Sequence, residues 1–139
     1  MIDRSKTLTE IEGEDWGPST FDSHLVITCH KMRHKPVNDL ADGDLRMAIG
    51  QQFSLPILVP LALERLGADP LLVATFFEGD LLTNVLQVNE VFWAGHPRLW
   101  QRTNTIAMIA LSKAEHLDDF WQETCGLQLR QAYDKFAAR

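Results

Sequence analysis

Basic residues are missing from a long central part of this sequence, because no Lys or Arg occurs between Leu66 and Pro97. Over the whole chain, 19 acidic residues stand against 13 basic ones, which gives a formal net charge of −6. Proteins that bind nucleic acid neutralise its phosphates with clusters of Lys and Arg. The sequence therefore predicts no direct nucleic-acid ligand. It leaves a basic protein as a candidate partner, since opposite charges accelerate association.

Cysteine and long apolar runs are scarce as well. Cys29 and Cys125 form no CxxC pattern, and the first residues are polar and charged, unlike the apolar core of a secretory signal. We therefore expect a cytoplasmic protein with two free thiols. The longest apolar stretch, residues 55–66, has only 12 residues. A stretch of that length is too short to cross a bilayer, so no membrane association is expected.

Catalytic signatures are equally scarce. The sequence has no GxSxG elbow, no glycine-rich phosphate loop and no dinucleotide fingerprint. His30 and His34 have the i, i+4 spacing that can place two imidazoles on one metal, but basic residues crowd them and no HExxH glutamate lies between them. We predict a protein with no enzymatic activity, no cofactor and no bound metal. A small metal-dependent hydrolase that uses these histidines or pairs of acidic residues remains an alternative.

The length of 139 residues and the 45% hydrophobic content predict one globular domain over residues 1–139, with an irregular acidic lead-in over residues 1–20. Apolar residues recur at spacings of three and four, and no stretch alternates as a strand would. We therefore predict an all-α fold of about seven to eight helices packed as antiparallel pairs. Residues 55–66 are apolar nearly all round, which is typical of a central helix.

Turn and capping residues predict where the other helices begin and end. A short helical turn surrounds Leu8 and Ile11, and Ser23 caps a helix that Pro36 ends. Asp42 begins a helix with an Asp42–Arg46 ion pair, and Pro60 either starts or kinks the central helix. The remaining predicted helices are a short one after Asp69-Pro70, one over 80–94, one over 97–111 and one over 117–136 with a bend at Gly126.

The net charge lies in the middle of the sequence. Residues 36–96 hold eight acidic residues and only two basic ones, Arg46 and Arg65. The simplest interpretation is a solvated acidic face. The functional alternative is a docking surface for a cation-rich protein.

Four blocks in this part of the sequence resemble immunity proteins of bacterial contact-dependent growth inhibition. The blocks are Asp44-Leu-Arg-Met-Ala-Ile-Gly-Gln51, Leu55-Pro-Ile-Leu-Val-Pro-Leu-Ala-Leu-Glu64, Phe76-Phe-Glu-Gly-Asp-Leu-Leu82 and Val91-Phe-Trp93. Upstream, Cys29-His30 and Arg33-His-Lys-Pro36 fit the same pattern. The resemblance covers roughly residues 15–110, and the spaced series of blocks is more specific than any one of them.

The resemblance implies a cytoplasmic inhibitor that binds the toxic C-terminal domain of a large cell-surface effector. The toxin it implies is a nuclease, with an RNase as the first hypothesis, because an acidic inhibitor would compete with nucleic acid for a basic surface. A helical adaptor for another basic protein remains an alternative. Trp93 is predicted to be a partly exposed aromatic anchor, with packing in the core as the alternative. The other residues predicted to bind the toxin are acids at helix starts and loop corners. The full set is Asp42, Asp44, Glu78, Asp80, Glu90 and Trp93.

Overall fold

The computed structural model describes residues 2–13 and 24–138 of the chain. Ser23 and residues 14–20 of the acidic lead-in lie outside the described residues. The helices follow one another along the chain as α1 (Leu8–Glu12), α2 (His24–Met32), the 3₁₀ turn η1 (Val37–Asp39), α3 (Asp42–Gly50), α4 (Leu55–Ala68), α5 (Asp80–Leu86), α6 (Glu90–Gly95), α7 (Pro97–Ala114), α8 (Asp119–Glu123) and α9 (Cys125–Ala137).

The prediction of an all-α fold is confirmed. Within residues 2–13 and 24–138 the structure has no β-strand, and the one β-bridge joins Thr7 to Pro36. The described part has nine α-helices, slightly more than the expected seven to eight, because two of the expected helices are each divided in two. A continuous cluster of buried apolar side chains extends from Leu8 to Phe136.

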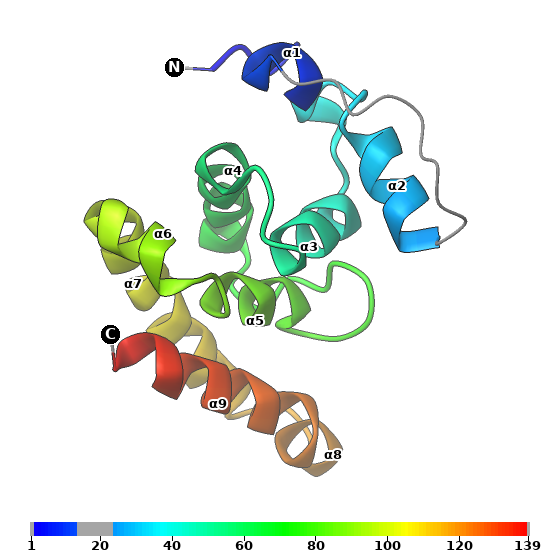
Figure 1. Ribbon diagram of the computed structural model, residues 1–139. Helices are drawn as coiled ribbons and strands as arrows, with labels where there is room; N and C mark the ends of the chain where they lie inside the picture. Colours follow the sequence, from blue (N-terminus) through cyan, green and yellow to red (C-terminus); the bar gives the residue numbers. More distant parts are fainter. Residues whose placement is uncertain (1, 14–23, 139) are drawn as a thin grey trace.

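Helix α4 is the central element, as the sequence predicts. It is buried on most sides, and α3, α5 and α7 pack around it (Figure 1). The helix begins at Leu55 and continues through Pro60. Pro56 lies in the first turn of the helix, where a backbone N–H has no partner within the helix, so the proline costs no hydrogen bond there. Of the two alternatives expected at Pro60, a start or a kink of the helix, the start is therefore excluded.

Three predicted helix boundaries are corrected by the structure. Residues 69–79, where a short helix is expected after Pro70, form an irregular loop. The expected helix over 80–94 is two helices, because the side chain of Asn89 accepts a hydrogen bond from Phe92 N and so starts α6 anew. The last expected helix is likewise divided into α8 and α9 at Thr124, just before Gly126.

Helices α7 and α9 form an antiparallel pair at one side of the molecule (Figure 1). Trp100, near the start of α7, stacks on Phe136 near the end of α9, with ring centroids 5.0 Å apart. One turn further along α7, the Asn104 side chain accepts a hydrogen bond of 2.8 Å from the Tyr133 hydroxyl. The opposite order of these contacts in the two helices confirms the expected antiparallel packing for this pair.

Candidate functional site

The loop over residues 69–79 is held in place by Asp80, the first residue of α5. The Asp80 carboxylate accepts hydrogen bonds from the backbone nitrogens of Ala74, Thr75 and Phe76, at 2.7, 2.9 and 2.8 Å. Asp80 is only 3% exposed. Gly79 precedes it with a φ of +86°, a conformation that favours glycine. The expectation of a solvated Asp80 carboxylate is therefore wrong: this acid orders the loop.

The loop lies against the start of α3, and the two acids there are paired. Asp42 Oδ1 lies 2.8 Å from an Arg65 guanidinium nitrogen, so its partner is not the expected Arg46. Asp44 lies 3.3 Å from the Lys35 ammonium and accepts a hydrogen bond from the backbone N–H of Ala41. The predicted Asp42–Arg46 pair is wrong because it rests on local spacing alone. Arg65 is distant in the sequence and reaches Asp42 only because α4 packs beside α3.

Arg46 instead turns toward the loop. Its Nε donates to the Thr75 hydroxyl at 3.0 Å, and its guanidinium carbon lies 4.7 Å from the ring centroid of Phe76. Phe76 is 71% exposed, which is high for an aromatic side chain. Glu78 is exposed in the same loop. We call this set the α3–loop surface: Asp42, Asp44, Arg46, Phe76 and Glu78.

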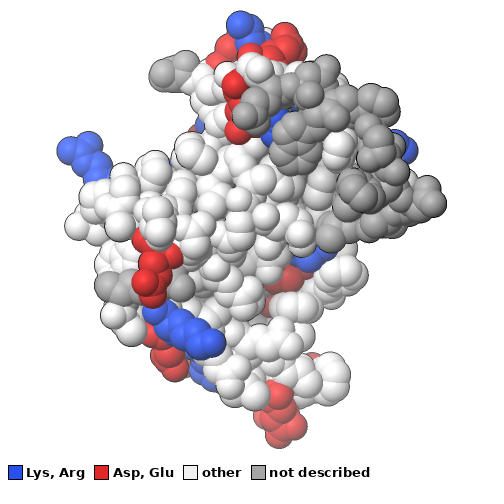
Figure 2. All heavy atoms as spheres, viewed as in Figure 1, with Lys and Arg blue, Asp and Glu red and all other residues white. Residues whose placement is uncertain are grey.

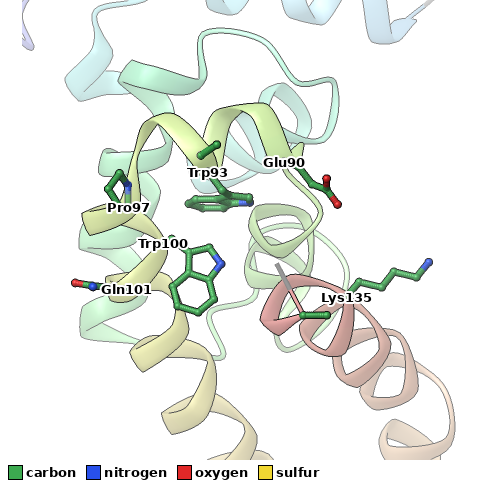
Figure 3. A pocket seen from close by; sticks show the side chains of 8 residues that line it. Glu90, Trp93, Pro97, Trp100, Gln101 and Lys135 are labelled. Atoms are coloured by element: carbon green, nitrogen blue, oxygen red, sulfur yellow. The ribbon is translucent and has the colours of Figure 1, made fainter.

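The other two predicted residues, Glu90 and Trp93, lie in a different place. They line a cleft of about 600 Å³ between α6, the start of α7 and the end of α9. Trp100 and Lys135 also line this cleft, which we call the tryptophan cleft (Figure 3). Trp93 is 4% exposed, so it is no protruding anchor. The Phe136 ring of α9 packs edge-on against Trp93, with ring centroids 5.3 Å apart, and the sequence pattern of α6 alone does not reveal that contact.

On the face that Figure 2 shows, the acidic side chains do not form one continuous patch. Figure 2 shows acidic side chains in separate small groups, with uncharged surface between them. Asp42 and Asp44 are paired with cations, and Asp80 is buried beneath the loop. The net charge of −6 remains, but local pairing disperses the concentrated acidic face that the sequence predicts.

The thiols and histidines fit a structural role. Both cysteines are free, and burial raises the pKa of the Cys29 thiol. His34 Nδ1 lies 3.0 Å from the backbone oxygen of His30, in the helical i, i+4 relationship. Among the residues the structure describes, no three His, Cys, Asp or Glu side chains are grouped so that they could hold a metal ion. In the same part of the chain, no helix is long and apolar enough to cross a membrane.

Comparison with known proteins then decides the family. A family model described as CDI immunity proteins matches residues 10–103, which is more than half of the chain. This chain is a CDI immunity protein. The match confirms the resemblance to immunity proteins of contact-dependent growth inhibition, whose function is to neutralise a toxin. No curated protein sequence and no solved structure gives a significant match.

The matched segment of this immunity protein contains the whole α3–loop surface and most of the tryptophan cleft, but not Lys135. Sequence reasoning missed four residues of these sites: Arg46, Phe76, Trp100 and Lys135. Phe76 stands beside Phe77, and no local signal distinguishes the exposed ring from the half-buried one. The nearest signal is the Glu78-Gly79-Asp80 turn that follows, which places the preceding residues in a loop.

Proposed function

We propose that this immunity protein neutralises its toxin by docking the α3–loop surface on the toxin domain of the effector, in the cytoplasm. The observation that carries the proposal is the exposed Phe76 ring on a loop that a buried carboxylate holds fixed. A rigid, exposed aromatic side chain is typical of the residues that dominate binding energy at interfaces. A loop ordered before binding also loses little conformational entropy when the partner docks.

Charge supports a basic face on the toxin. The immunity protein carries −6 overall, and the exposed Glu78 follows Phe76 by two residues in the same loop. A nuclease needs a basic surface for its own substrate. We therefore propose a nuclease, with an RNase as the first candidate, whose basic substrate-binding face is covered by the α3–loop surface.

The test uses the purified full-length chain and the toxin domain encoded next to it. Phe76→Ala removes the ring from the interface. We expect the loss of its apolar burial to weaken binding by about 2 kcal/mol, which raises Kd about thirtyfold. Met108→Ala is the matched control, because Met108 is a large side chain, 57% exposed, on the distant helix α7. Equal toxin binding by wild type and Phe76→Ala, measured by titration calorimetry, would place the interface elsewhere. A nuclease assay on the same samples tests the proposed toxin activity separately.

A further inference from the structure

The loop over residues 69–79 and the α8–α9 junction carry most of the exposed large apolar side chains. Within residues 2–13 and 24–138, seven such side chains are exposed, and four of them lie on this loop, on α8 or on the first turn of α9. The four are Val73, Phe76, Phe120 and Leu127. Phe120, in α8, is 75% exposed, slightly more than Phe76. The exposed ring on the loop therefore has a counterpart on α8.

One hydrogen bond joins α8 to the loop. The indole nitrogen of Trp121 donates to the backbone oxygen of Glu78 at 3.1 Å. Phe120 adjoins one end of this contact and Phe76 is two residues from the other, so chain geometry limits the separation of their Cα atoms to roughly 20 Å. Figure 1 shows the loop and α8 on the same side of the molecule, at the right of the view. An interface of about 800 Å² per partner is roughly 30 Å across, so one partner can cover both rings.

Helix α8 is held in place although it has only five residues. At its start, the side chain of Asp118 accepts a hydrogen bond from the backbone N–H of Trp121 at 2.8 Å. Near its end, Gln122 Nε2 donates to the backbone oxygen of Ala114 at 2.7 Å, which ties α8 to the end of α7. The Phe120 ring is thus presented by a segment that is ordered before binding, and little conformational entropy is lost when a partner covers it.

The charge around Phe120 is acidic. Four acids and no Lys or Arg lie between Lys113 and Arg130. All four are exposed, and none of them forms an ion pair in the part of the chain that the structure describes: Glu115, Asp118, Asp119 and Glu123. The two acids of α3, in contrast, are paired with cations. We call Phe120 and these four acids the α8 surface, and its unpaired charges attract a basic partner.

The α3–loop surface is too small to hold a toxin domain by itself. It has five residues, of which Asp42, Asp44 and Arg46 are half-buried, whereas a standard interface uses about 20–30 residues on each side. A toxin seated on Phe76 must therefore cover neighbouring surface as well. The α8 surface lies next to the loop and offers what such a partner needs, an exposed ring among unpaired acids.

We infer that the toxin interface extends from the loop, across the Glu78–Trp121 contact, onto the α8 surface, with Phe120 as its second aromatic anchor. The inference rests on the proposed function, since the occupant is the same basic face of the toxin. Lys and Arg side chains of the toxin lie against the acids, and apolar surface between them packs on the ring. A second copy of this chain suits the α8 surface poorly, because a symmetric contact would bring the same unpaired acids together.

Phe120→Ala tests the anchor, with the purified full-length chain and the toxin domain encoded next to it. We expect Kd to rise about tenfold, mainly through faster dissociation, because the ring is lost from the interface. Val91→Ala is the control and should leave Kd unchanged, since Val91 is 83% exposed on α6, at the other side of the molecule (Figure 1). Circular dichroism checks the folding of both variants.

The outcomes separate this inference from the proposed function. An unchanged Kd in Phe120→Ala, together with a raised Kd in Phe76→Ala, would overturn the extension onto α8 and leave the α3–loop surface in place. A raised Kd in Phe120→Ala, with none in Phe76→Ala, would reject docking on the α3–loop surface and support the anchor on α8.

The double variant Asp119→Asn, Glu123→Gln tests the charges at nearly constant shape and leaves the capping Asp118 intact. We expect association with the toxin to slow about threefold at low salt, with a difference that shrinks as salt is added and with little change in dissociation. Equal association rates at every ionic strength would overturn the assignment of basic toxin side chains to the α8 surface.

Light scattering on the free protein tests the other occupant, a second copy of the chain. We expect wild type and Phe120→Ala to have the same mass in solution. A dimer that Phe120→Ala converts to a monomer would show that a second copy covers the α8 surface, and would overturn the inference.

Discussion

The guanidinium group of Arg46 lies over the ring of Phe76, 4.7 Å from its centroid, and so supports an aromatic side chain that water surrounds on its other side. A cation–π contact at an exposed site contributes about 0.5–1 kcal/mol. This contact joins a residue of α3 to a residue 30 positions later in the loop, and it orients the ring that we propose as the anchor for the toxin.

Arg46→Met is expected to weaken toxin binding about threefold, much less than Phe76→Ala, because the ring remains while its support is lost. The methionine keeps the unbranched stem that packs beside the loop. Binding is measured by calorimetry and folding by circular dichroism. A loss as large as that of Phe76→Ala would mean that Arg46 contacts the toxin directly.

Asp80→Asn is expected to lower the free energy of unfolding by about 2–3 kcal/mol, because three backbone N–H groups would lose a charged acceptor at a buried site. Urea denaturation measures the change. Asp69→Asn, an exposed acid at the start of the same loop, is the control and should alter stability by less than about 0.5 kcal/mol. Equal stabilities of the two variants would show that Asp80 does not order the loop.

Glu78→Lys is expected to leave stability within about 0.5 kcal/mol but to slow association with the toxin about threefold at low salt. Glu78 is exposed, so the change acts on the approach of a basic partner and not on the core. Association rates at several ionic strengths measure the effect, and the difference should shrink as salt screens the charge. A faster association would indicate an acidic toxin surface at this point.

Gly126→Ala is expected to destabilise the protein by about 1–3 kcal/mol through overpacking at the α8–α9 junction. A Cβ atom at Gly126 would lie 2.6 Å from a ring carbon of Trp121, whose indole nitrogen is fixed by a hydrogen bond to the Glu78 backbone oxygen. Gly95→Ala is the matched control, because no atom lies within 4 Å of a Cβ added there. Thermal denaturation compares the two, and similar melting temperatures would contradict the packing described at Trp121.

Cys29 is expected to react slowly with a thiol reagent in the folded protein, since its pKa is raised by burial and only the thiolate reacts. The variant Cys125→Ser leaves Cys29 as the one thiol in the sequence. Labelling at pH 8 should be slow in buffer and fast in urea. The raised pKa also means that the unfolded chain loses this proton first, so stability should fall as the pH rises above about 9. Fast labelling in buffer would contradict the burial of Cys29.

Local patterns in the sequence were enough for the helical class and for the strongest helices. The period of apolar residues predicts α4 and α7 because a helix buries one face through spacing that is visible within one segment. The loop at 69–79 was predicted wrongly as a helix because Asp69-Pro70 has the local signature of a helix start. In the folded protein, Asp80 of α5 points back at this loop and accepts hydrogen bonds from the backbone N–H groups of residues 74–76, which stabilises a non-helical conformation there.

Local sequence patterns are enough to predict an all-α fold and an acidic chain without a catalytic motif, and the series of blocks from Asp44 to Trp93 indicates the family. Tertiary structure alone decided which of those residues reach the surface. Asp80 and Glu78 are two positions apart, yet one is buried and the other exposed, and Trp93 is covered by a helix that begins 32 positions later. Exposure depends on which distant segments pack together, and that information is spread over the whole chain rather than written in any local pattern.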